Sequence, residues 1–127
     1  SSFVIIRDDD KIKKNFGSFI SFSWIITGEE NKAPNYAVFM FTYLLGEQFF
    51  DFYKLTEFIL TVKKSYRDNP YHNFSHAFTV CHCIFNILNR NKESFTKLEV
   101  ILIIVICHSN KKKFTILLFF KNLLMYE

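Results

Sequence analysis

Apolar residues in the middle of the chain recur at the spacing of an α-helix. Two such stripes are present, and each places its members on one helix face at intervals of three or four residues. The first stripe is Leu55, Phe58, Ile59, Val62 and Tyr66, and the second is Ala77, Val80, Cys81, Ile84, Phe85 and Leu88. This pattern predicts an α-helical region from Tyr36 to about Cys107.

The helical region is expected to be interrupted three times. The predicted breaks are residues 52–55, 68–71 and 89–95. Pro70 explains the second break, because the residue before a proline is pushed out of the α region. After the third break, Thr96 and Glu99 match a capping box. The capping box predicts a further helix from residue 97 to about residue 107.

The two ends of the chain lack this pattern. Residues 1–35 are expected to form an irregular N-terminal segment. Within it, Phe19–Ile26 leaves a strand open as an alternative, because it is rich in β-branched and aromatic residues. Residues 36–108 make the helical domain, and residues 109–127 form a divergent tail. The divergent tail and the lack of an initiator Met before Ser1 lead us to expect a truncated or differently spliced chain.

Composition favours one globular domain and excludes several classes of protein. Half of the 127 residues are hydrophobic and 19% are aromatic, whereas disordered chains are poor in aromatic residues. The net charge of +4 comes from lysine runs such as Lys111–Lys113. No basic stripe interleaves with aromatics, so nucleic acid is not an expected partner. The longest apolar run, Val100–Cys107, is shorter than the roughly 18 residues of a membrane span.

The cysteines point to a reducing compartment. Cys81, Cys83 and Cys107 form no C-x-x-C pair, so neither a zinc ribbon nor a thioredoxin-like site is indicated. On a helix, Cys81 and Cys83 would point to different faces. Reduced, buried thiols of this kind are typical of intracellular proteins, so a cytoplasmic location is expected.

The candidate functional motif is the run Tyr71-His72-Asn73-Phe74-Ser75-His76-Ala77. His72 and His76 are four residues apart, so on a helix they lie one turn apart on the same face. This spacing can bring two imidazoles to one metal or to one reacting group. Taken alone, such a pair is more often two ordinary histidines. Asn73 has two open roles, because it can hydrogen-bond an imidazole or cap the helix.

Further residues around the motif give it a context. Val-Lys-Lys-x-Tyr-Arg occupies residues 62–67, the pair His82-Cys83 follows the motif, and Phe95-Thr96 and Leu98-Glu99 come later. Together with the motif, they make residues 36–108 resemble the 3′,5′-cyclic nucleotide phosphodiesterases. Residues 62–67 and the His82-Cys83 pair look closest to the dual-specificity branch that hydrolyses both cAMP and cGMP, called phosphodiesterase type ten.

The resemblance implies a fold, a mechanism and site residues. The fold is all-α, a partial helical bundle from the N-terminal part of the HD-type catalytic domain. Two metals, usually zinc and magnesium, would share a bridging hydroxide that attacks phosphorus. By position, His72 resembles the general acid that protonates the departing 3′ oxygen, and His76 resembles the first metal ligand. Tyr71 is the implied substrate-binding residue, and His108 is the candidate for a further metal ligand.

The resemblance is incomplete at residue 109. The family has His-Asp where this chain has His108-Ser109, and a hydroxyl is a poorer ligand than a carboxylate for a hard dication. The spacing from His76 to His108 is also about two residues short, which rotates a helical side chain by roughly 200°. The alternative for His108 is therefore an imidazole at the end of a helix that binds no metal. Phe74 replaces the Trp that is usual in the family.

The expected function is that of a 3′,5′-cyclic nucleotide phosphodiesterase in signal transduction. Its substrates would be cAMP, cGMP or both. A homodimer is one expected state of the complete enzyme. With Ser109 in place of Asp, the chain alone is expected to be inactive. Two alternatives remain. One is a non-catalytic truncated form or interaction fragment, and the other is a small helical metal-binding module that uses His72, His76 and His82.

Overall fold

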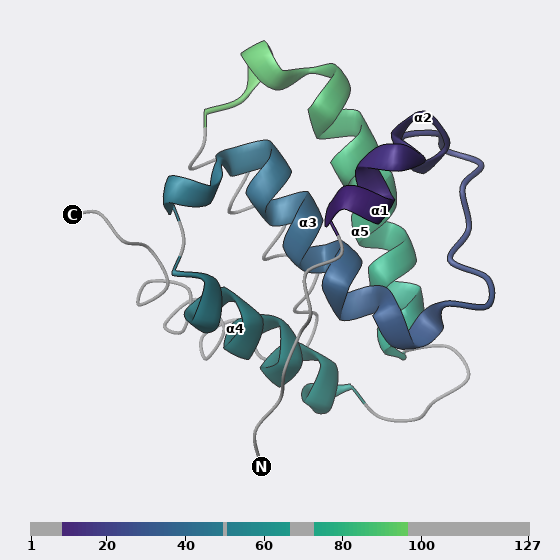
Figure 1. Cartoon of the computed structure of the whole chain (residues 1–127), viewed down its shortest axis with the longest axis vertical. Coiled ribbons are helices and arrows are strands. Elements are labelled where there is room, and N and C mark those ends of the chain that lie inside the picture. The colour runs from purple at the N-terminus through teal and green to yellow at the C-terminus, as the bar shows by residue number, and fades with distance from the viewer. Residues whose placement is uncertain (1–8, 50, 67–72, 97–127) are drawn as a thin grey trace.

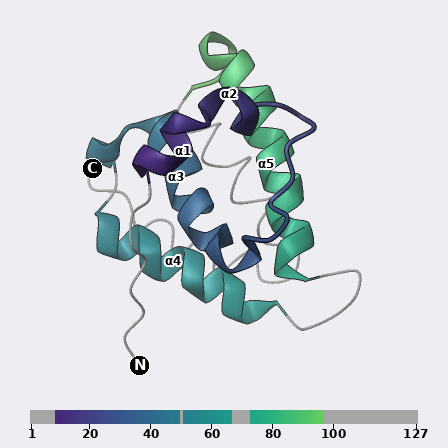
Figure 2. The same cartoon turned by 45° about the vertical axis from the view of Figure 1, so that its right-hand side comes forward.

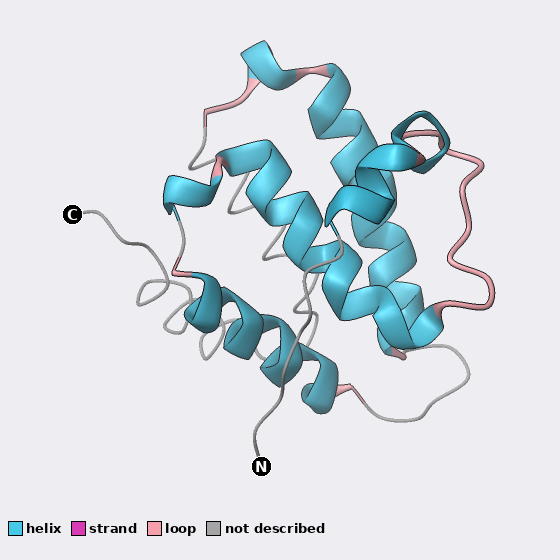
Figure 3. Cartoon of the chain, viewed as in Figure 1, coloured by secondary structure: helices cyan, strands magenta, loops and turns pink. Residues whose placement is uncertain are grey.

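A computed structural model describes residues 9–49, 51–66 and 73–96 of the chain (Figure 1). Within these ranges every regular element is a helix and none is a strand (Figure 3). The α-helices are α1 (Asp9–Lys14), α2 (Phe16–Phe19), α3 (Ala33–Leu45), α4 (Phe52–Ser65) and α5 (Phe74–Arg90). Short 3₁₀ turns occupy Glu30–Lys32, Glu47–Phe49 and Lys92–Ser94. The all-α fold class is confirmed. In the described part of the chain, no helix is both long and apolar enough to span a bilayer.

Helix α3 is the centre of the fold. It packs against both α4 and α5, and Figures 1 and 2 show it running between these two helices. Ten of its 13 residues are buried, on every side of the helix. A helix that is apolar all round is stable only when other elements cover it, so the neighbouring helices are arranged around α3.

The connection from α3 to α4 places the first break earlier than predicted. Gly46 ends α3 with φ of 93°, a backbone conformation that favours glycine. A Cβ at this position would also lie 2.9 Å from Oε1 of Gln48. Asp51 then caps α4, because its Oδ1 accepts the backbone N–H groups of Tyr53 at 2.9 Å and Lys54 at 3.3 Å. The helix therefore begins at Phe52, where the break was expected.

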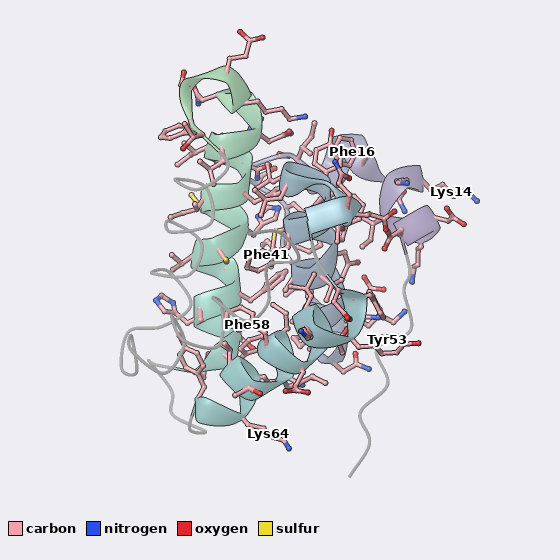
Figure 4. All side chains as sticks on the ribbon, turned by 90° about the vertical axis from the view of Figure 1, so that its left-hand side faces the viewer. Lys14, Phe16, Phe41, Tyr53, Phe58 and Lys64 are labelled. Carbon is pink, nitrogen blue, oxygen red and sulfur yellow. The ribbon has the colours of Figure 1, made fainter. Side chains whose placement is uncertain are left out.

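The predicted stripe of α4 is confirmed as its buried face. Leu55, Phe58, Ile59 and Val62 are all buried, and Tyr66, just beyond the helix end, is partly buried against the core. The rings of Phe41 and Phe58 meet edge to face with centroids 6.1 Å apart. Figure 4 shows these two rings inside the bundle, whereas Tyr53 and Lys64 point outward.

The predicted stripe of α5 is confirmed, and four more residues of the helix are buried. The members of the stripe are buried, apart from Val80 and Ile84, which are partly exposed. The additional buried residues are Phe74, Phe78, His82 and Asn86. The helix ends at Arg90, inside the predicted break at residues 89–95. The break at 68–71, the helix at 97–107 and the tail at 109–127 lie largely or wholly outside the described residues.

The N-terminal segment is more ordered than its pattern indicated. Its described part holds α1 and α2, and residues 20–29 form turns and loop, so the strand alternative at Phe19–Ile26 is not what forms. Phe19 is the anchor of this segment. Its ring packs against five others, with centroids 4.9 to 5.8 Å away. The five rings belong to Trp24, Tyr36, Phe39, His82 and Phe85.

Replacing Phe58 with alanine is expected to lower the free energy of unfolding by about 3–5 kcal/mol, because a buried ring is lost and a cavity remains. The matched control is Tyr53→Ala on the same helix. Its side chain is 82% exposed, so the change should stay within about 0.5 kcal/mol. Urea unfolding followed by far-ultraviolet circular dichroism measures both variants. Equal effects would contradict the packing of α4 against α3.

Candidate functional site

The N-terminus of α5 positions the candidate motif. Asn73 is the N-cap residue, with extended backbone angles of −108° and 173°. Its Oδ1 accepts the backbone N–H of His76 at 2.8 Å, and its carbonyl accepts the N–H of Ala77 at 3.2 Å. Of the two roles open to Asn73, the structure supports the cap. The cap fixes where the helix begins, and so it fixes the direction in which His76 leaves the helix.

The buried side of the first turn holds this helix end in place. Phe74, Ala77 and Phe78 are buried. The ring of Phe74 meets that of Tyr66 with centroids 6.1 Å apart, and the ring of Phe78 lies 6.2 Å from that of Tyr36. The start of α5 is thereby packed against α3 and the end of α4. Any side chain on the opposite face of this turn must point outward.

His76 lies on that outward face and is exposed. An exposed imidazole is open to a metal ion or a substrate, and its neutral form is a good zinc ligand. The structure therefore gives His76 a rigid backbone position and an accessible ring.

The other predicted site residues lie outside the described ranges. They are Tyr71, His72 and His108, together with Ser109 at the departure from the family pattern. The structure therefore does not place them relative to His76, and their roles stay predictions. Among the residues that it does describe, no three His, Cys, Asp or Glu side chains gather in a way that could hold a metal.

His82 has a structural role that conflicts with its use in a metal-binding module. It is buried, and its Nε2 lies 2.6 Å from the carbonyl oxygen of Phe19. His76, six residues earlier, is exposed on another face of the same helix. The module that would use both histidines is therefore not supported. The signal for burial was in the sequence, because His82 follows Phe78 by four residues and precedes Phe85 by three.

The two described cysteines differ in exposure. The thiol of Cys81 is buried, whereas Cys83 is exposed. The expectation of different faces is confirmed, but burial holds only for Cys81. The reason is the helix period, since two positions along α5 turn the side chain by about 200°.

The curated proteins that are similar to this chain include three cyclic phosphodiesterases. The probable 3′,5′-cyclic phosphodiesterase pde-5 of Caenorhabditis elegans is 42% identical over 79 residues, which is 61% of the chain. The dual 3′,5′-cyclic-AMP and -GMP phosphodiesterase 11A of Takifugu rubripes is 42% identical over 62 residues, or 46% of the chain. The dual 3′,5′-cyclic-AMP and -GMP phosphodiesterase 11 of Drosophila melanogaster is 37% identical over 62 residues, also 46% of the chain.

The chain is similar to 3′,5′-cyclic phosphodiesterases. It spans only 11%, 7% and 4% of the length of these three relatives. No protein-family model matches it. The relatives support the wider resemblance to the cyclic phosphodiesterases, and the type-ten branch stays a prediction.

Replacing Asn73 with alanine is expected to lower the free energy of unfolding by about 1 kcal/mol, the usual effect of losing an N-cap. Asn73→Asp is the matched variant, because it keeps an oxygen that accepts the N–H of His76. Its stability should stay close to that of the unchanged chain. Thermal unfolding of the three proteins measures the difference. If the aspartate variant is as unstable as the alanine variant, Asn73 does not act as a cap.

Proposed function

We propose that this chain carries part of the catalytic machinery of a 3′,5′-cyclic nucleotide phosphodiesterase, which hydrolyses cAMP and cGMP to the 5′-monophosphates. The observation that carries the proposal is the 42% identity to a probable 3′,5′-cyclic phosphodiesterase over 61% of the chain. The motif at residues 71–77 agrees with it. Both substrates are proposed, because two relatives are named as dual cyclic-AMP and -GMP phosphodiesterases, in keeping with the dual-specificity branch predicted from the sequence.

The proposed roles divide the reaction between two histidines. His72 is the general acid, because an imidazolium can give its proton to the departing 3′ oxygen. His76 is a metal ligand, and its exposed ring on the capped first turn of α5 supports that role. Tyr71 contacts the substrate. The rigid start of α5 would hold His76 at a fixed angle while the ester is cleaved.

The proposed metals are zinc and magnesium, with His108 as a further ligand. When bound, such metals lower the pKa of a coordinated water and stabilise charge on phosphate oxygens. The described residues supply one imidazole, His76, and a zinc site needs three or four protein ligands. They therefore do not complete a site, and Ser109 offers no carboxylate for a second dication. This donor set supports a chain that is inactive by itself.

The second candidate is a non-catalytic form, which has the fold but does not hydrolyse cyclic nucleotides. The replacement of the family's Asp by Ser109 favours it, because catalysis by two metals depends on carboxylates that hold the cations. Such a chain would act by binding a partner, for example a complete copy of the enzyme. The complete enzyme is itself proposed to form homodimers. Both candidates are proposed to work in the cytoplasm, where unpaired cysteines stay reduced.

Zinc binding tests the role of His76. The full chain is expected to bind zinc weakly, and His76→Ala should weaken that binding about tenfold or more, which corresponds to about 1.4 kcal/mol or more. Cys83→Ser is the control, because Cys83 is the other exposed metal-binding side chain on α5 and its loss should leave the affinity unchanged. Isothermal titration calorimetry at neutral pH measures all three. An unchanged affinity in His76→Ala would remove its assignment as a ligand.

Hydrolysis tests the expectation that the chain is inactive by itself. The full chain, supplied with zinc and magnesium, is expected to release no 5′-monophosphate from cAMP or cGMP above a blank without protein. Ser109 is the physical reason, since one cation would lack its carboxylate ligand. Turnover that His72→Ala abolishes and Cys83→Ser preserves would overturn this expectation. It would show that a complete site is present in these 127 residues.

A further inference from the structure

One face of α5 holds the backbone of the N-terminal segment. His82, Asn86 and Arg90 lie at intervals of four residues, so they form a row along the helix. Each reaches a carbonyl oxygen of residues 19–21. The distances are 2.6 Å from His82 Nε2 to Phe19, 3.4 Å from Asn86 Nδ2 to Ser21 and 3.1 Å from Arg90 Nη2 to Ile20. We call this row the α5 clasp.

The clasp supplies hydrogen-bond donors to backbone carbonyls of the N-terminal segment. Residues 20–29 form turns and loop, so most of their carbonyls have no partner in a helix or sheet. Buried carbonyls without partners are costly. Side chains from α5 supply the donors, and the Arg90 guanidinium also lies over the ring of Phe22, 4.5 Å from its centroid. The segment is therefore fastened to α5 by side chains and not by a backbone ladder.

His82 is one of two buried members of the clasp, the other being Asn86. The His82 side chain is 4% exposed, and its ring lies 4.7 Å from the ring of Trp24 and 5.0 Å from that of Phe19. Because the Phe19 carbonyl can only accept, Nε2 must carry the hydrogen of the neutral imidazole. A second proton at Nδ1 would place a full charge among these aromatic rings.

Asn86 is the polar neighbour of His82 in the clasp, and its Nδ2 lies 3.5 Å from Nε2 of His82. Its Nδ2 must face the Ser21 carbonyl, which accepts and does not donate. Its Oδ1 is buried, and none of the residues that the structure describes donates a hydrogen bond to it. The polar groups around His82 therefore suit the neutral ring, because the N–H groups of His82 and Asn86 already face backbone carbonyls.

We propose that the α5 clasp is a pH-sensitive device, in which protonation of His82 releases residues 19–25 from α5.

The direction of the pH effect follows from burial. Burial lowers the pKa of His82 below its ordinary value of 6.5, and the hydrogen bond to the Phe19 carbonyl opposes this effect without cancelling it. The released ring binds a proton more readily than the clasped ring. The clasp is therefore at full strength above pH 6.5. It weakens as the pH falls below that value, until the lowered pKa is passed.

The other charged or titratable groups on the surrounding elements do not reverse this direction. Tyr36 from α3 packs against Trp24, and its hydroxyl donates to the Glu29 carboxylate at 2.9 Å. Arg90 is already cationic and lies two turns along α5, so it disfavours a second positive charge. Cys81 and Cys83 are the titratable side chains nearest to His82 along α5 itself.

Trp24 provides the readout, because it is the sole tryptophan of the chain and lies against His82. We expect its fluorescence emission to shift to longer wavelength as the full chain is acidified from pH 8 to pH 5, with a midpoint below 6.5. His82→Gln keeps an N–H donor and cannot be protonated, so its emission should not change over this range. His76→Gln removes an exposed histidine and should leave the transition in place.

A second measurement keeps the test decisive if the glutamine variant does not fold. The ring carbons of the histidines in the unchanged chain are followed by nuclear magnetic resonance over the same pH range. One histidine must titrate with the midpoint seen for Trp24. Emission that does not depend on pH, an equal transition in a folded His82→Gln chain, or midpoints that disagree would each overturn the proposal. No nucleotide or metal is present, so the result does not depend on the proposed function.

Discussion

The burial of α3 from every side is the constraint on which the rest of the structure depends. A helix with Val38, Phe39, Met40 and Phe41 as consecutive buried residues presents apolar side chains in nearly every direction. It must be covered by α4 and α5 and by the segment that contains Phe19. The positions of those elements, and hence the direction in which His76 points, follow from the need to cover α3.

The sequence allowed the helices with one buried stripe to be predicted, because their signal is local. Leu55, Phe58, Ile59 and Val62 repeat at the helical period, and all four are buried. The burial of Phe19 was not predictable in this way. Its helix has four residues, which is too short for a period, and its partners come from α3 and α5. The start of α4 was also misplaced, because the cap at Asp51 adjoins an apolar run that conceals the boundary.

The candidate site was predictable as a motif and less so as a geometry. Asn73 had two roles compatible with its position, and only the distance to the His76 amide favours the cap. The exposure of His76 and the burial of His82 depend on which face of α5 meets α3. Two histidines on one helix therefore have opposite surroundings, one accessible to a ligand and the other committed to the backbone of a distant segment.

The burial of α3 also has a consequence during synthesis on the ribosome. α3 leaves the exit tunnel before α4, and the end of α5 follows only after tens of further residues. At about 5–20 residues per second, its apolar surface stays uncovered by α4 and α5 for seconds. Apolar surface that is exposed in this way promotes association of the nascent chain with other molecules. The yield of the chain in a cell should depend on how fast the ribosome moves through the codons for α4 and α5.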